Sequence, residues 1–224
     1  MEYWKQYNLK LLDIASSMVL HNKHNLFNFV EDSFYNHIRD LIAMTIAMSN
    51  ANKESIIPMQ ILDYGSNQTV WANISNKIDT SLINVTIFDP FFDPLTPNID
   101  SDFDMKTLSS IEDLGKKKYD LVIYGSVAQY EENFISNIDP CIISETNYIL
   151  FTHTPMSLKE TFRSKQFSGY KDTQIIHSYQ DISDRFEKLD YSLIFKSTLP
   201  QKEASVEEKF VKDIVYANLL FIKK

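Results

Sequence analysis

The residues best suited to chemistry stand where a short apolar run meets a turn. Asp63 and Gly65 follow such a run, and Asp89 lies twenty-four residues beyond Gly65. Glycine lets the backbone approach a ligand closely, and an acid roughly 20 residues further along is spaced to bind ribose hydroxyls. The spacing therefore predicts a site for a nucleoside-containing ligand within residues 59–92.

Other kinds of chemistry have less support. His21 and His24 are three residues apart, but no Glu lies between them and the neighbouring Asn residues indicate a surface turn. Asp100, Asp102 and Asp104 could bind a hard cation, yet no glycine follows in the position of a calcium loop, which favours a solvated acidic loop. The serine hydrolase pattern Gly-x-Ser-x-Gly is absent. We therefore expect no metal site and no serine hydrolase.

The turn that contains Gly65 must be held between a strand and a helix. The apolar residues 61–62 predict the strand, and residues 69–77 predict the helix, whose apolar side chains can share one face: Val70, Trp71 and Ile74. A second strand runs into Asp89. In a parallel sheet the loops at the carboxyl ends of neighbouring strands can assemble one site.

A dinucleotide site is poorly supported. The pattern Gly-x-Gly-x-x-Gly would require glycines at positions 67 and 70, where the chain has Asn67 and Val70. A ligand with a ribose but no pyrophosphate would not need these glycines. A nicotinamide-dependent oxidoreductase is therefore the weaker alternative.

Two segments resemble the class I S-adenosylmethionine-dependent methyltransferases. Residues 62–67, Leu-Asp-Tyr-Gly-Ser-Asn, are similar to the first motif of that superfamily, in the form seen among its sugar and small-molecule methyltransferases. Residues 119–130 resemble its fourth motif, an aromatic-Asp-hydrophobic strand that runs into Ser-Val-x-Gln-Tyr or a similar sequence. The resemblance implies an α/β, Rossmann-like fold with a seven-stranded, mostly parallel sheet, an antiparallel terminal hairpin and an N-terminal helical extension.

The resemblance also implies a cofactor, S-adenosyl-L-methionine. Asp63, Gly65 and Ser66 would lie along its methionine part, Asp89 would bind the ribose hydroxyls, and Ile111 would frame the adenine. Asp63 could instead be a turn or capping carboxylate, and Asp89 an N-cap. The cofactor-binding residues implied are Asp63, Gly65, Ser66, Asn67, Asp89, Pro90, Ser110, Ile111, Gly125 and Ser126.

Methyl transfer to an alcohol is helped by a general base, and histidine is suited to that role. His153 stands at the expected end of a strand, and His177 follows a polar segment, so these two are the candidate catalytic residues. Either could instead be a histidine that only makes structural hydrogen bonds. Gln129, Tyr130 and the N-terminal Tyr7 are candidates for binding the acceptor.

The rest of the chain predicts two parts. Residues 1–55 contain no proline or glycine and carry apolar residues at helical spacing, which predicts a helical cap or extension. Residues 56–224 predict the α/β domain. Its further expected elements are a short strand within 103–108, a strand at 143–152, an irregular substrate loop at 156–176, a helix at 180–189 and closing strands at 191–197 and 215–222.

Composition limits the partners. The formal net charge of -8 over 224 residues opposes a nucleic-acid footprint, and no apolar run of 18 residues predicts a membrane span. Export signals and multiple cysteines are also absent, since Cys141 stands alone, so a soluble cytoplasmic protein is expected. The oligomeric state has no sequence signal.

Together these features predict a methyltransferase that modifies an oxygen or nitrogen atom of a small polar acceptor, such as a sugar or sugar-linked metabolite. The alternative is a methyltransferase-like fold that binds a ligand or partner without catalysis.

Overall fold

The computed structural model describes residues 32–51, 55–66, 68–75, 78–89, 105–114, 117–137, 145–165, 173–199 and 212–224. The chain divides into two compact units, residues 1–117 and 118–224. The helices expected before residue 32 lie outside the described residues. The boundary expected after residue 55 stays a prediction.

Three parallel strands form the sheet of the first unit. β1 (Met59–Tyr64) pairs with β2 (Ile83–Phe88), and β2 pairs with β3 (Met105–Leu108). The register aligns Tyr64 with Phe88 and Phe88 with Leu108, so the three strands end level with one another. β1 was predicted from an apolar run, β2 as the strand that runs into Asp89 and β3 as a short strand within 103–108. Their common carboxyl end is the edge at which a ligand was expected.

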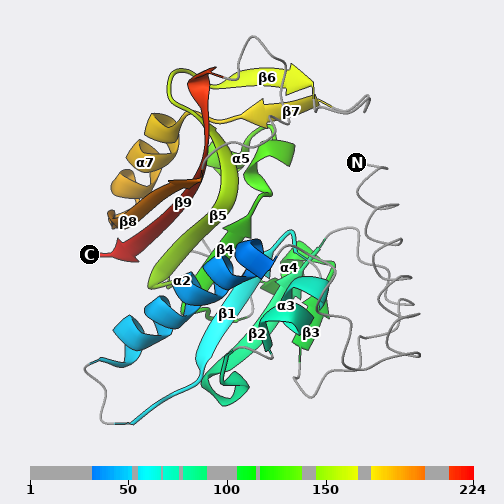
Figure 1. The fold of residues 1–224 in the computed structure, drawn as a ribbon, viewed down its shortest axis with the longest axis vertical. Coiled ribbons are helices and arrows are strands. Elements are labelled where there is room, and N and C mark those ends of the chain that lie inside the picture. Colours follow the sequence, from blue (N-terminus) through cyan, green and yellow to red (C-terminus); the bar gives the residue numbers. More distant parts are fainter. Residues whose placement is uncertain are drawn as a thin grey trace. The chain divides into compact units, whose positions relative to one another are not determined.

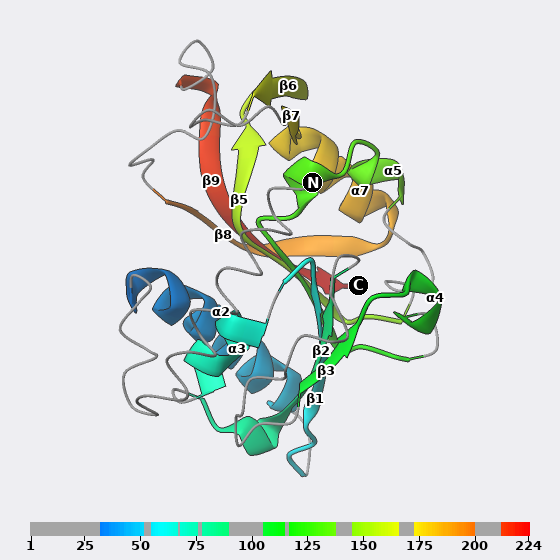
Figure 2. The ribbon, with the colours of Figure 1, turned by 90° about the vertical axis from the view of Figure 1, so that its right-hand side faces the viewer.

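Two helices of the first unit lie side by side (Figures 1 and 2): α2 (Asp32–Asn50) and α3 (Gln68–Ser75). α2 buries one apolar stripe at helical spacing, formed by Ile38, Leu41, Ile42 and Ile46. α3 buries Trp71 and Ile74 completely, whereas Val70 is half-buried. The described residues of this unit also form two short elements, η2 (Thr80–Leu82) before β2 and α4 (Ile111–Leu114) after β3.

The second unit contains a mixed sheet. β4 (Leu121–Gly125) pairs in parallel with the first half of β5 (Tyr148–Ser157). β9 (Ile214–Lys223) lies antiparallel between β5 and β8 (Tyr191–Leu199), as Figure 1 shows. The antiparallel pair confirms the predicted closing hairpin. Phe151, Phe186 and Phe221 contact one another in the core of this unit.

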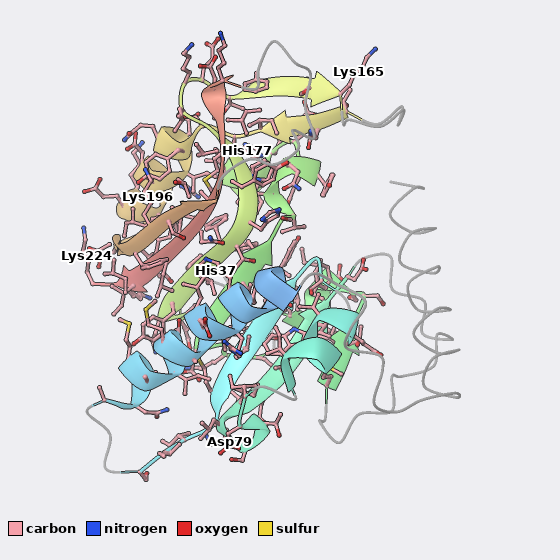
Figure 3. All side chains as sticks on the ribbon, viewed as in Figure 1. His37, Asp79, Lys165, His177, Lys196 and Lys224 are labelled. Carbon is pink, nitrogen blue, oxygen red and sulfur yellow. The ribbon has the colours of Figure 1, made fainter. Side chains whose placement is uncertain are left out.

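One sequence expectation was wrong in the segment after β5. Residues 156–176 are not simply irregular, because β6 (Phe162–Lys165) and β7 (Thr173–Ile176) form a separate antiparallel hairpin. Figure 3 shows Lys165 at the end of β6, pointing away from the hairpin. Both strands are only four residues long and carry polar residues, so neither has the apolar run by which a buried strand is recognised.

Three further elements belong to the second unit. α7 (Tyr179–Lys188) contacts β8 and begins at Ser178, whose hydroxyl accepts hydrogen bonds from the amides of Gln180 and Asp181. η3 (Ala128–Tyr130) and α5 (Phe134–Asn137) follow β4. η3 contacts β7, so the hairpin lies against the segment that carries the predicted acceptor residues.

Over the described part of the chain, the strands follow the order β3-β2-β1-β4-β5-β9-β8 of a seven-stranded sheet. This order confirms the predicted mostly parallel sheet with an antiparallel terminal hairpin. None of the helices formed by the described residues is long and apolar enough to cross a membrane.

Candidate functional site

The turn after β1 is joined to the end of β2. Gly65 has a φ of 75°, a left-handed conformation that glycine adopts without steric cost, and its amide donates a 2.7 Å hydrogen bond to the carbonyl of Phe88. The next residue, Asp89, donates its amide to the carbonyl of Leu108 at 3.0 Å. These two bonds place Gly65, Asp89 and the residues after Leu108 along one edge of the first unit.

Asp63 supports this turn from inside the protein. Its side chain is 3% exposed, and Oδ2 accepts a 2.7 Å hydrogen bond from the indole Nε1 of Trp71. Burial raises the pKa of the Asp63 carboxyl from 3.8 to about 6, although hydrogen bonds from Ser66 and Trp71 oppose the rise. The predicted contact of Asp63 with a cofactor stays a prediction, because the described partners of its carboxylate belong to the turn and to α3.

The segment after β3 offers an apolar side chain at the same edge. Ile111, the first residue of α4, is 47% exposed, and Ser110 before it hydrogen-bonds Glu112. A further bond ties α3 to β3, since Gln68 Nε2 donates to Thr107 Oγ1 at 3.3 Å. The first unit thus brings together four of the predicted cofactor residues: Gly65, Asp89, Ser110 and Ile111.

In the second unit, the end of β4 is tightly packed against β5. A Cβ added to Gly125 would lie 3.2 Å from Oγ1 of Thr152, so the Thr152 side chain lies close against the Gly125 backbone and leaves little room for a larger residue. Ser126 adopts a left-handed φ of 50°, and its amide donates to the carbonyl of Thr152 at 3.0 Å. Its hydroxyl donates to the carbonyl of His153. Ser126 and His153, predicted separately, are therefore in direct contact.

The expected position of His153 at the end of a strand was wrong. Parallel pairing with β4 stops at Thr152, but β5 continues to Ser157 after a bulge at His153. His153 has a φ of 47°, its amide donates to Asn218 Oδ1 at 2.9 Å, and its ring stacks on Tyr216 with 4.7 Å between centroids. The bulge lets the strand change partners without ending.

His177 is buried between the hairpin and the segment after β4. Its Nε2 lies 3.0 Å from the carbonyl oxygen of Ala128 and 3.3 Å from that of Glu131, so this nitrogen carries the hydrogen. Figure 3 places His177 beside α5, and its ring lies 5.9 Å from that of Phe134. Burial lowers the pKa of His177, against the opposing effects of the two carbonyls and of Asp181. His177 is only 3% exposed, so its position suits a structural role in which it holds the segment after β4 by hydrogen bonds.

The two predicted acceptor residues after β4 differ in burial. Gln129 is 5% exposed, and its Oε1 has no hydrogen-bond partner within the described residues, whereas Tyr130 is half-buried. The hydrogen bonds from His177 to the carbonyls of Ala128 and Glu131 hold the two ends of this short segment. Asn67, Pro90 and Tyr7 lie outside the described residues, and so do the alternating acids of residues 100–104.

Sequence reasoning missed the partners that hold these residues. Trp71 was recognised as apolar but not as the donor to Asp63. Asn218 was counted as part of an apolar strand, although a polar residue that is 1% exposed within such a strand is a signal that a specific hydrogen bond is needed. No sequence signal paired Asn218 with His153, because 65 residues separate them.

Comparison with solved structures shows which fold this protein has. No protein-family model matches the chain, and no curated protein matches its sequence. Among solved structures, the N-terminal domain of EvdMO1, solved in the presence of S-adenosylhomocysteine and D-fucose, has a TM-score of 0.58 at 7% identity, covering 96% of this chain and 97% of that one. Magnesium protoporphyrin IX methyltransferase from Synechocystis PCC 6803, with bound S-adenosylmethionine, has a TM-score of 0.51 at 11% identity with the same shares covered.

A third neighbour, the [4+2]-cyclase SpnF, has a TM-score of 0.52 at 10% identity and covers 84% of this chain and 80% of that one. The protein therefore has the fold of the class I S-adenosylmethionine-dependent methyltransferases, as its motifs indicated. Because a protein named as a cyclase shares the fold, activity has to be argued from the site.

Proposed function

We propose that this protein is an S-adenosylmethionine-dependent methyltransferase that modifies an oxygen or nitrogen atom of a small polar acceptor. The observation that carries the proposal is the edge formed by Gly65, Asp89 and Ile111 at the level ends of β1, β2 and β3. A glycine turn, an acid and an exposed apolar side chain suit the three parts of a nucleoside ligand with a polar tail.

Each of these residues fits a separate part of the cofactor. Gly65 is exposed, so its backbone can approach the methionine part, and the half-buried Asp89 can accept hydrogen bonds from ribose hydroxyls. Ile111 can cover the adenine ring. Asp63 holds the turn in shape through Trp71. When bound, S-adenosylmethionine supplies an activated methyl group on a sulfonium centre.

The candidate acceptor residues within the described chain belong to the second unit. In that unit Gln129 and Tyr130 follow the end of β4, the kind of strand end where ligands bind in open α/β sheets, and His153 lies at the bulge where the parallel pairing of β5 with β4 stops. We assign His153 as the group that takes a proton from the acceptor, and Gln129 and Tyr130 as residues that orient it. The buried His177 is given a structural role. A sugar or sugar-linked acceptor is favoured by the presence of D-fucose with the EvdMO1 domain.

Calorimetry with S-adenosylmethionine and S-adenosylhomocysteine tests the cofactor assignment. Binding of both is expected, and a folded protein that binds neither would sink the proposal. Transfer of a labelled methyl group to a panel of monosaccharides, including D-fucose, and of nucleotide-linked sugars then tests the acceptor class. Cofactor binding with no transfer to any acceptor would favour the non-catalytic alternative. A thermal-shift comparison with NADH and NADPH separates an oxidoreductase, which would be stabilised by one of them instead.

A further inference from the structure

Two left-handed residues that are not glycine lie in contact at the end of β4. Ser126 has a φ of 50° and His153 a φ of 47°, although they are 27 residues apart in the chain. The Ser126 amide donates to the carbonyl of Thr152, and its hydroxyl donates to the carbonyl of His153. Left-handed backbone is unfavourable for residues with a Cβ, so it persists only where surrounding contacts hold it.

Those contacts come from a third strand. On β9, Asn218 is 1% exposed and accepts the amide of His153 on Oδ1 at 2.9 Å. Its Nδ2 donates to Ser197 Oγ on β8 at 3.0 Å. The Asn218 amide therefore has one orientation, because its nitrogen faces a hydroxyl and its oxygen must face the N–H of His153. The backbone of His153 is therefore held on one side by Ser126, which follows β4, and on the other by Asn218 of β9.

The pairing of β5 with β9 shows what these contacts achieve. Phe151 pairs with Leu219 and Thr154 with Ala217, so two residues, Thr152 and His153, stand opposite the single residue Asn218. This is a β-bulge, which re-aims the side chain at the bulged position. Beyond it, the ring of His153 stacks on that of Tyr216 with an interplanar angle of 27°.

A bend alone would not need this arrangement. Glycine adopts a left-handed φ without steric cost and would turn the strand more cheaply. The chain instead has a serine and a histidine at the two strained positions, and two part-buried hydrogen bonds hold the backbone of the histidine. Strained residues of this kind cluster at active sites, where surrounding contacts hold a side chain in place for function.

We propose that Ser126 and Asn218 are positioning residues that fix the His153 imidazole for work on the methyl acceptor. The role of His153 on the acceptor rests on the proposed function, whereas the positioning of its ring does not. Ser126 acts through the carbonyl of His153 and Asn218 through its amide. Loss of either contact releases the bulge and lets the ring leave Tyr216.

The position of the ring can be read directly by NMR. The full-length protein is labelled with ¹⁵N in its histidine rings, and the His153 signals are identified as those missing in His153→Gln. Stacking on Tyr216 places the ring protons over an aromatic face, which moves their signals upfield. The variants compared are Ser126→Ala, Asn218→Ala and Asn218→Asp, with Ser157→Ala as the matched control because it removes a buried hydroxyl from the same strand.

We expect Ser126→Ala and Asn218→Ala to move the His153 signals downfield toward those of unstacked histidines. Asn218→Asp keeps an acceptor for the His153 amide and should retain more of the upfield shift than Asn218→Ala, and Ser157→Ala should leave the signals in place. Unchanged His153 signals in Ser126→Ala and Asn218→Ala, even with lower thermal stability, would show a merely structural role and overturn the inference. If Asn218→Ala does not fold, Ser126→Ala decides.

Failure of the proposed function is seen in a different measurement. A wild-type protein that binds no S-adenosylhomocysteine would refute the cofactor assignment while the His153 signals still respond to Ser126 and Asn218. Conversely, unresponsive His153 signals in a protein that binds S-adenosylhomocysteine would refute only the positioning roles.

Discussion

The indole Nε1 of Trp71 donates a 2.7 Å hydrogen bond to the buried carboxylate of Asp63. Trp71 is fully buried on α3 and Asp63 is 3% exposed on β1, so the bond joins the helix to the strand across the turn at Gly65. An indole N–H can only donate and a carboxylate can only accept, so the pair satisfies a polar atom on each side. The proposed cofactor turn therefore rests on a buried acid.

Asp63→Asn should change the pH dependence of stability. Because the pKa of Asp63 is raised in the folded state, the unfolded chain loses this proton first, and folding stability falls as pH rises from 3.8 to about 6. The size is about 3 kcal/mol, at about 1.4 kcal/mol for each pH unit between the folded and unfolded pKa values. Urea unfolding from about pH 4 to about pH 7 should show that the variant lacks this loss.

The matched control is Asp79→Asn. Hydrogen bonds from Ser81 hold the pKa of the exposed Asp79 carboxyl below its ordinary value of 3.8, so the stability that this ionised acid contributes is lost only as pH falls below about 3.8. Asp79→Asn should therefore keep the wild-type fall in stability between about pH 4 and about pH 7. If wild type and Asp63→Asn have parallel profiles, Asp63 does not carry a raised pKa.

Asp89→Ala should weaken binding of S-adenosylhomocysteine. The lost interaction is a hydrogen bond to a charged group, worth about 1.5–3 kcal/mol, or roughly 10- to 150-fold in the dissociation constant. Calorimetry measures this directly. Asp79→Ala is the control, because Asp79 caps η2 and bonds Ser81 in the same unit. Equal affinity in wild type and Asp89→Ala would refute the ribose role.

The sequence predicted the parts of the fold that have a local signal. The buried strands and α3 follow from apolar runs and helical spacing, and the capping Ser178 agrees with the predicted start of α7. The extension of β5 was missed because His153 and Pro155 resemble a strand end. Only the bulge, a tertiary arrangement fixed by Asn218, shows why the strand continues.

Site residues were predicted as separate positions, and their partners were not. The sequence placed Gly65 and Asp89 at neighbouring strand ends because parallel strands bring those ends together, and the hydrogen bonds at Phe88 and Leu108 agree with that placement. It could not predict that His177 would be enclosed by two carbonyls. The burial of His177 depends on the hairpin formed by β6 and β7, and the short polar strands of this hairpin carry no apolar pattern.

His177→Gln should change the pH dependence of folding stability in the opposite direction to Asp63→Asn. Burial keeps His177 neutral and lowers its pKa, so the unfolded chain takes up a proton first as pH falls through about 6.5. The stability that neutral His177 contributes is present above that pH and is lost below it. Urea unfolding from about pH 5 to about pH 7.5 should show a smaller loss at the acid end in the variant. A difference between the two proteins that does not vary with pH would contradict this account.

His153→Gly should be more stable than His153→Ala. Both variants remove the imidazole and its stacking on Tyr216, so their difference isolates the backbone at a φ of 47°. Alanine in left-handed backbone costs about 1–2 kcal/mol, which glycine avoids, and thermal or urea unfolding should resolve a gap of about 1 kcal/mol. His37 on α2 is the matched site, because in a helix glycine is about 1 kcal/mol worse than alanine, so there the order must reverse. If alanine is the more stable substitution at both positions, the bulge at His153 is not held under strain, and the positioning roles of Ser126 and Asn218 lose their physical basis.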